Sequence, residues 1–165
     1  MSNIHSGFLL RRLATLLAIT ILTLSLLAAF TGVLLSFYYG PTAGSAFDSV
    51  KQISTQVPNG WLIRSLHNMA GNSLIGVSLI QILVMFLGER YRPSWLTAWV
   101  SGILLSLTAI ALGWTAMSLG WTQLGYWRLS IELGTIEAIP LIGSQLRTIL
   151  TGGGAIGTVT VEHLY

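Results

Sequence analysis

Cysteine is absent from this chain of 165 residues, and charged residues make up only 8% of it. Without cysteine the protein has no disulfide, thiolate metal site, iron–sulfur cluster or thioether-linked heme. The scarcity of charge excludes a water-soluble domain, in which about a quarter of the residues are Asp, Glu, Lys or Arg. The few basic residues therefore bear on membrane topology rather than on nucleic-acid binding.

Hydrophobic residues, in contrast, make up 53% of the chain, and the mean hydropathy is +0.74. This composition indicates an all-α integral membrane protein, because about 20 consecutive apolar residues cross the hydrocarbon core as a helix. We expect three transmembrane helices, at about residues 13–37, 62–87 and 94–118. The uncharged run 13–47 is far longer than the core of a signal peptide, so we expect the first helix to be retained.

Two further segments have helical patterns but are too polar to cross the bilayer. Residues 45–57 have apolar side chains at spacings that favour an amphipathic helix at the membrane surface. Residues 128–149 alternate apolar and polar residues with a break at Ile139–Pro140, which predicts two short surface helices within about 121–150. Together the spans and surface helices predict a single membrane domain over residues 1–165.

Basic residues are distributed unevenly between the two ends of the predicted spans. On the side of the N-terminus four bases face one acid: Arg11, Arg12, Arg90 and Arg92 against Glu89. On the other side four bases face four acids: Lys51, Arg64, Arg128 and Arg147 against Asp48, Glu132, Glu137 and Glu162. Loops with excess Lys and Arg stay inside, so we expect the N-terminus on the cytoplasmic or stromal side. His67 then lies toward the lumenal or periplasmic side.

Arg64 and His67 are the clearest candidates for a binding site. They lie three residues apart at the start of the second predicted span, on one face of the helix. A cation beside an imidazole suits a ligand with a metal centre and an anionic edge. For His67 the structural alternative is a hydrogen bond to a neighbouring helix. Gln81 follows fourteen residues later, close to four helical turns, and should return to nearly the same face.

Gly32, near the end of the first predicted span, has two interpretations. Small residues let membrane helices approach one another closely, so helix packing is one of them. The other is clearance for a flat cofactor, because a glycine leaves room beside the backbone.

Six segments of the chain resemble the N-terminal half of cytochrome b, and of cytochrome b6 in particular. They occur in the same order and without a large gap, at residues 32–41, 46–50, 60–67, 99–102, 118–127 and 138–144. The segment at residues 60–67 reads Gly60-Trp-Leu-Ile-Arg-Ser-Leu-His67. The likeness extends from about Thr31 to the last residue.

The resemblance implies a helical bundle with b-type heme. Members of this family hold two hemes, each between a histidine of the second helix and a histidine of the fourth. His67 matches the second-helix axial ligand of the heme nearer the outer face, and Arg64 matches the arginine that pairs with a heme propionate. Residues 126–143 correspond to a segment of the family's quinol-oxidation pocket.

The chain departs from the family pattern around the inner heme. Gln81 stands where the second histidine of that helix is expected, and an amide is a poor ligand for heme iron. Ala18 and Ile19 replace paired glycines, which indicates a partly filled inner site, although Gly102 is kept. There are three further departures. Ala116 replaces a family glycine, and Leu16 lies at or near the place of a cysteine that binds an extra heme. The Pro-Glu-Trp-Tyr motif is missing.

The last residues align with the approach to the family's fourth helix, so we expect that helix and its two histidines to be missing from this sequence. His163 is a weak substitute, because it stands where the family has an arginine, on the surface side of the missing ligand.

Three readings of function follow. The chain is a cytochrome b6-like subunit of a photosynthetic or respiratory electron-transport complex, holding one heme b at His67. Alternatively it is a heme-free structural or accessory subunit, or a chlorophyll-binding subunit, since magnesium needs a single axial ligand. We expect a multi-pass protein of the thylakoid or bacterial inner membrane, with other subunits as partners and a contact with quinone. The isolated chain is not expected to oxidise quinol.

Overall fold

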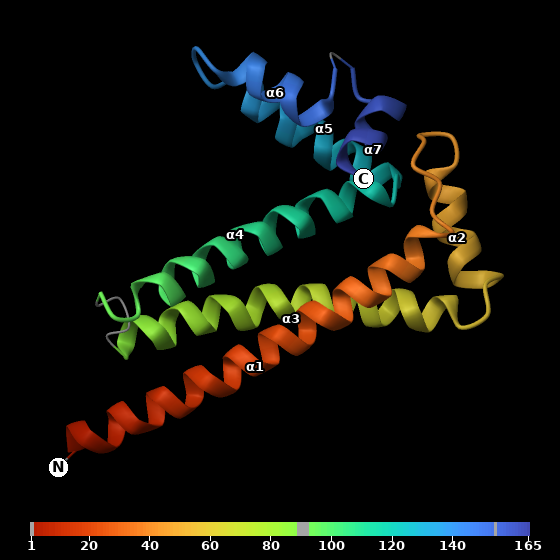
Figure 1. Cartoon of the computed structure of the whole chain (residues 1–165). Helices are drawn as coiled ribbons and strands as arrows, with labels where there is room; N and C mark the ends of the chain where they lie inside the picture. The colour runs from red at the N-terminus through yellow and green to blue at the C-terminus, as the bar shows by residue number, and fades with distance from the viewer. Residues whose placement is uncertain (1, 89–92, 154) are drawn as a thin grey trace. The chain divides into compact units, whose positions relative to one another are not determined.

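The computed structural model describes residues 2–88, 93–153 and 155–165, with side chains from residue 7 onward. All regular structure within these ranges is α-helical, as the composition predicts. Figure 1 follows the helices along the chain: α1 (Ser2–Ser36), α2 (Ala46–Thr55), α3 (Gly60–Leu87), α4 (Leu96–Leu119), α5 (Gln123–Glu137), α6 (Gly143–Thr151) and α7 (Thr158–Leu164).

Three of these helices are long and apolar enough to cross a membrane, which confirms the three predicted spans. They are Gly7–Ser36, Gly60–Leu87 and Leu96–Leu119. α1 begins well before the apolar run, at Ser2. Glu89, Arg90 and Arg92, which enter the charge count on the side of the N-terminus, lie outside the described residues.

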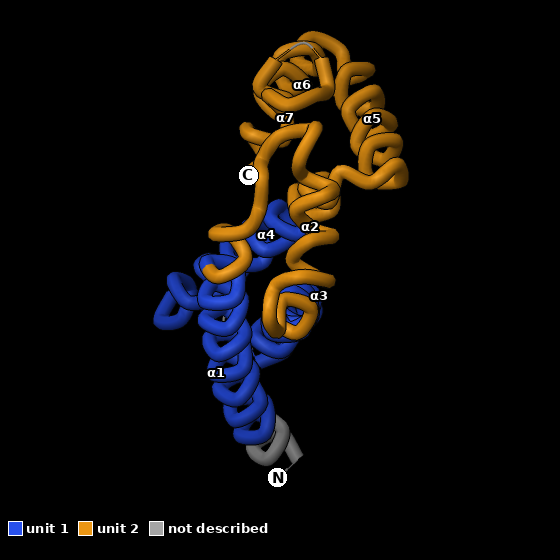
Figure 2. The backbone as a smooth tube through the Cα atoms, turned by 90° about the vertical axis from the view of Figure 1, so that its right-hand side faces the viewer, with its two compact units in different colours: residues 1–33, 63–113 blue, residues 34–62, 114–165 orange. Residues whose placement is uncertain are grey.

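The described chain forms two compact units, coloured separately in Figure 2. Unit 1 consists of residues 1–33 and 63–113, and unit 2 of residues 34–62 and 114–165. Each unit is described by itself below, and the single-domain interpretation stays a prediction.

Unit 1 contains most of the three membrane helices. Its buried apolar residues come from all three, at Ile21, Ala70, Val84, Met85 and Ala109. Small residues allow close approach, and an atom at the Cβ position of Gly113 on α4 would lie 2.9 Å from Cδ1 of Ile75 on α3. The buried hydroxyls of Ser78 and Ser106 donate to carbonyls of their own helices, so they cost little within the membrane.

Unit 2 contains the shorter helices and the adjoining ends of the long ones. α2 buries Ala46, Ser49 and Ile53 on one face, within the segment where the sequence predicts an amphipathic helix. α5 and α6 are separated at residues 138–142, as the Ile139–Pro140 break predicts. α6 packs on both α5 and α7 and ends at Gly152, whose φ of 69° is the left-handed conformation of a helix C-cap.

α7 was not predicted. It is short, and its polar sequence gives no periodic signal of its own. It buries Thr160 and Val161 against the rest of unit 2, so its stability comes from tertiary packing rather than from intrinsic propensity.

The corner between α4 and α5 is held by polar contacts. The Thr122 hydroxyl accepts a hydrogen bond from the Gly125 N–H and caps α5. Glu132 accepts from the Trp114 indole N–H at 2.5 Å and from Arg128 Nε at 2.7 Å. The carboxylate thereby ties the end of α4 to the second turn of α5.

Candidate functional site

His67 lies in the second turn of α3, within unit 1, and is half-buried against α1. Its Nδ1 atom is 3.0 Å from the carbonyl oxygen of Ala28 and 3.1 Å from the hydroxyl oxygen of Thr31. The interior position of this imidazole agrees with the sequence prediction. Its two partners on α1 were not predicted.

These contacts assign the hydrogen of the imidazole. The Thr31 hydroxyl donates to the carbonyl oxygen of Leu27 at 2.6 Å, so toward His67 it acts as an acceptor. The Ala28 carbonyl can only accept. Nδ1 therefore carries the hydrogen, and the lone pair of the ring is on Nε2, which makes no hydrogen bond within the part of the chain that the structure describes.

Gly32 leaves room for the ring of His67. An atom at the Cβ position of Gly32 would lie 3.0 Å from Cε1 and 3.5 Å from Nδ1 of the imidazole. The clearance at this glycine is thus used by the histidine side chain, a close helix approach of the kind that small residues permit. Whether it also accommodates a flat cofactor stays a prediction.

Arg64 lies one turn before His67 on α3 and is exposed. This placement agrees with the expected pair of a cation nearer the helix end and an imidazole deeper in the bundle. A guanidinium so placed can donate two parallel hydrogen bonds to an anionic group.

Gln81 repeats the contact of His67 farther along the same pair of helices. Its Nε2 donates to the carbonyl oxygen of Ala14 at 3.1 Å, and its side chain is buried. Fourteen residues separate His67 from Gln81, and fourteen separate Ala14 from Ala28, so α1 and α3 run antiparallel with both side chains on one seam. The prediction that Gln81 shares a face with His67 is confirmed.

The inner half of unit 1 is closed differently from the sequence expectation. Ala18 and Ile19 were expected to fill the inner cofactor space, but both side chains are exposed. Gln81 itself joins α1 to α3 there. Its Oε1 atom is buried and has no hydrogen-bond partner among the described residues. Next to Gly102 the space is open, since an added Cβ would meet nothing within 4 Å.

The other residues singled out in the sequence lie elsewhere. Ala116 is exposed on α4. His163 is on α7 in unit 2, where an atom at the Cβ position of Gly152 would be 3.0 Å from its Cβ. No group of three or more His, Cys, Asp or Glu side chains that could hold a bare metal ion occurs among the described residues.

The partners of His67 and Gln81 carry only a weak sequence signal. Two of them are backbone carbonyls, which any residue supplies. Thr31 is a hydroxyl residue in an apolar run, but Thr15, Thr20 and Thr23 of α1 likewise donate to carbonyls of their own helix. Only the rotation and register of α1 against α3 distinguish Thr31 from these.

Comparisons with known proteins identify the family of this chain. A family model described as Cytochrome b/b6/petB matches residues 1–165. Cytochrome b6 of Cyanidium caldarium is 37% identical over 144 residues, which cover 87% of this chain and 67% of that protein. Cytochrome b6 of Auxenochlorella protothecoides is 37% identical over 143 residues, which cover 87% of this chain and 66% of that protein.

A solved structure described as "Hyperthermophilic respiratory Complex III" contains a chain with the same fold. The TM-score is 0.75 at 26% identity, over 92% of this chain and 41% of that one. The present chain thus spans about two thirds of the curated relatives and less than half of the solved chain. The matched family model covers every residue, and the chain belongs to the cytochrome b/b6 family.

Proposed function

We propose that this integral membrane protein is a cytochrome b6-like subunit of an electron-transport complex and holds one b-type heme through His67. The observation that carries the proposal is the hydrogen bond from Nδ1 to the Ala28 carbonyl. Metal-binding histidines almost always donate their other ring N–H to a carbonyl, carboxylate or water, which fixes the ring and makes the ligand nitrogen more basic. His67 has such a hydrogen bond at Nδ1, so Nε2 is the nitrogen that would coordinate the iron.

A bound heme would supply one-electron transfer, and this chain's residues would hold and shield it. His67 would be the axial ligand, oriented by Ala28 and Thr31. Arg64 would donate to a propionate, since a guanidinium forms bidentate hydrogen bonds with carboxylates. The apolar surroundings of the spans would limit the access of water to the site.

A single heme fits the described residues better than two. At the inner position the side chain is an amide whose N–H is already used by Ala14, and an amide oxygen is a poor ligand for heme iron. We therefore assign no heme to Gln81. A second ligand for the iron would come from a partner chain or from a water molecule, or the iron would have none.

The partners and orientation follow from the family. The relatives are cytochromes b6, and the solved neighbour is from a respiratory Complex III, so we propose partner subunits of that kind in a thylakoid or bacterial membrane. We also propose a contact with quinone along residues 126–143, and an N-terminus on the cytoplasmic or stromal side because of its excess of arginine.

A heme-free scaffold subunit is the alternative that a specific observation favours. The imidazole of His67 packs over Gly32 and its Nδ1 is satisfied by α1, so the site is well formed without a ligand. Such a chain would keep its bundle for assembly alone. Chlorophyll at His67 has no comparable observation in its favour and enters as an outcome of the test.

Difference spectroscopy on the purified chain in mild detergent separates these functions. The proposal expects a b-type band in the dithionite-reduced minus oxidised spectrum and a pyridine hemochrome of about one heme per chain. His67→Leu should lose both, and the control His163→Leu should keep both, because His163 lies in the other unit. A chain without either signal would be the scaffold, and pigment extracted at a fixed ratio and lost in His67→Leu would indicate chlorophyll.

A further inference from the structure

Unit 2 contains a cleft of about 600 Å³ that the proposed heme function does not use. It opens between the first turn of α2 with the loop before it and the first turn of α5 with the loop before it. Its size is in the range of small-ligand pockets. The lining residues are Ala43, Gly44, Phe47, Asp48, Trp121, Thr122, Gln123, Tyr126 and Trp127.

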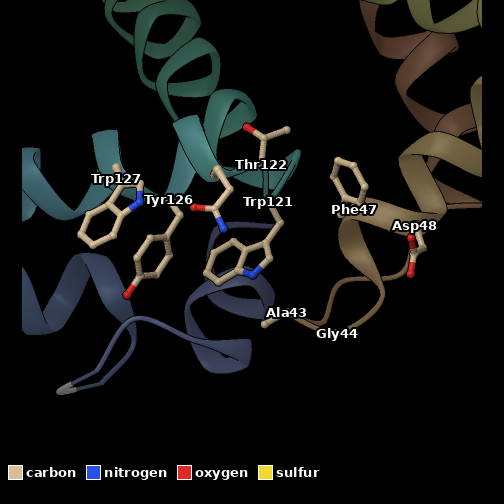
Figure 3. A pocket seen from close by; sticks show the side chains of 9 residues that line it. Ala43, Gly44, Phe47, Asp48, Trp121, Thr122, Tyr126 and Trp127 are labelled. Atoms are coloured by element: carbon tan, nitrogen blue, oxygen red, sulfur yellow. The ribbon is translucent and has the colours of Figure 1, made fainter.

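Three aromatic rings form one wall of this cleft at right angles to one another. The ring centroids of Trp121 and Tyr126 are 6.0 Å apart with an interplanar angle of 77°, and those of Tyr126 and Trp127 are 5.4 Å apart at 81°. Figure 3 shows these rings on one side of the opening and Phe47 with Asp48 on the other. Rings in edge-to-face contact form a continuous wall, and the free face of an aromatic ring attracts a cation.

Asp48 gives the cleft a negative charge without a partner from the chain. Its carboxylate makes no ion pair or hydrogen bond with the residues at 2–88, 93–153 and 155–165, although Lys51 follows one turn later on α2. Glu132 and Glu137 of the same unit are instead paired, with Arg128 and Arg147. A negative charge that faces an aromatic wall across the cleft favours a cationic ligand.

The backbone of Trp121 is held in an unfavourable conformation at this cleft. Its φ is 42°, in the left-handed region that residues with large side chains rarely adopt. Strain of this kind persists where the surroundings impose it, and it is concentrated at ligand sites. The indole is thus placed on the cleft wall at a conformational cost.

The position of the cleft limits the kind of ligand. The membrane-spanning parts of α1 and α4 end at Ser36 and Leu119, only a few residues before the lining loops, so the cleft lies at the depth of the lipid headgroups. The first turns of α2 and α5 also border it, and helix N-termini favour negative charge close by. A ligand with an ammonium group and a phosphate at headgroup depth meets both conditions.

We propose that this cleft binds the headgroup of a zwitterionic phospholipid, with the ammonium group held between the wall of Trp121, Tyr126 and Trp127 on one side and the carboxylate of Asp48 on the other. Aromatic residues are common at membrane surfaces and need no ligand. A plain aromatic belt does not, however, discriminate between headgroups, and it does not depend on a carboxylate. The proposal is independent of heme binding at His67.

Native mass spectrometry of the full chain in a neutral detergent tests it, with phosphatidylcholine and phosphatidylglycerol of identical short acyl chains as probes. We expect about tenfold tighter binding of phosphatidylcholine, the size of effect that a partly desolvated cation–π site gives. Asp48→Asn and Trp127→Leu should each remove most of this preference. The matched controls Glu162→Gln and Trp61→Leu should keep it, since neither residue lines the cleft, and Trp61 is exposed to 61% compared with 59% for Trp127.

Each other outcome overturns the proposal in a defined way. Equal binding of the two lipids, or a preference that survives both cleft variants, leaves an ordinary aromatic belt. If soluble phosphocholine saturates the cleft at the same concentration as the lipid, the cleft is a binding site for a free solute and not for a lipid. Displacement of phosphatidylcholine by a short-chain quinone assigns it to the proposed quinone contact. Circular dichroism of the variants, which should match the parent chain, separates loss of binding from loss of fold.

Discussion

The Nδ1 atom of His67 lies 3.0 Å from the carbonyl oxygen of Ala28, across the seam between α3 and α1. The same seam contains the contact of Gln81 with Ala14, at 3.1 Å. Two polar side chains that would be costly in a membrane thus each donate a hydrogen bond to a carbonyl of the neighbouring helix, although Gln81 Oε1 has no partner among the described residues. The first leaves Nε2 of the imidazole without a hydrogen bond among the described residues, whereas the second uses the amide nitrogen of Gln81.

Thr31→Val should weaken heme binding by a modest factor. The substitution keeps the shape of the side chain but removes the oxygen that lies 3.1 Å from His67 Nδ1, one of two acceptors that orient the ring. A hydrogen bond of this kind contributes about 1 kcal/mol, so the dissociation constant for heme should rise about fivefold. Heme titration of the apo-protein measures this dissociation constant.

The matched control is Thr23→Val, on the same helix. The Thr23 hydroxyl is exposed and bonds only to the carbonyl of Ile19 in its own helix. Equal heme affinity in the two variants would contradict the orienting role of Thr31.

Gly32→Ala should displace the imidazole of His67. The added methyl group would lie 3.0 Å from Cε1, tighter than nine in ten real Cβ contacts, so the ring must shift by a few tenths of an ångström. We expect a loss of about 1–3 kcal/mol of stability from this overpacking, together with reduced heme content. Thermal unfolding and the hemochrome assay report the two effects.

Gly76→Ala serves as the comparison, because an added Cβ on that part of α3 meets nothing within 4 Å. Alanine is the better helix former, so this variant should be as stable as the parent or more stable. A Gly32→Ala protein that behaves like Gly76→Ala would show that the ring tolerates the methyl group.

Gln81→Leu should cost no more than about 1 kcal/mol, because membrane hydrogen bonds between helices are weak and the change also removes a buried oxygen without a partner. Gln81→Glu should cost about 2–3 kcal/mol at neutral pH, since it sets a carboxylate against the Ala14 carbonyl within the membrane. The Glu variant should recover at acidic pH, where the protonated carboxyl can donate. Unfolding in detergent at both pH values tests this order, and a Leu variant less stable than the Glu variant would reverse it.

Gly125→Ala should destabilise the corner between α4 and α5. An atom at the Cβ position of Gly125 would lie 2.9 Å from the carbonyl oxygen of Met117, which is backbone and cannot move aside. We expect a loss of about 1–3 kcal/mol. Gly134→Ala on the same helix meets nothing within 4 Å and should be neutral or stabilising, so similar unfolding temperatures for the two would contradict the close approach.

Tyr39 should make unit 2 sensitive to alkaline pH. Burial, with a smaller contribution from the nearby Tyr165, raises the pKa of its phenol from 10.0 to about 12, and the neutral hydroxyl donates to the Leu119 carbonyl at 2.7 Å. Because the folded-state pKa is the higher one, this contribution to stability is complete below pH 10 and is lost as the pH rises toward 12. The free energy of unfolding measured across this pH range should fall less in Tyr39→Phe than in the parent. Parallel falls in the two proteins would contradict the role of Tyr39.

Several features were predictable from the sequence because they depend on local composition. The three spans follow from the length of apolar runs against the thickness of a bilayer, and the break between α5 and α6 follows from Pro140. The shared face of His67 and Gln81 follows from helical periodicity. The start of α1 and the whole of α7 were not predictable in this way, since neither lies in an apolar run.

The sequence by itself therefore determined the all-helical membrane architecture, the family, and the candidacy of Arg64, His67 and Gly32, because chain-local patterns and matched motifs carry that information. Only the tertiary structure decided which atoms of α1 receive His67 and Gln81, and that the ring of His67 takes up the clearance at Gly32. It alone brought Asp48 and Trp127 to one cleft. These relationships join residues far apart in the chain, and they depend on the register and rotation of packed helices, which hydropathy does not encode.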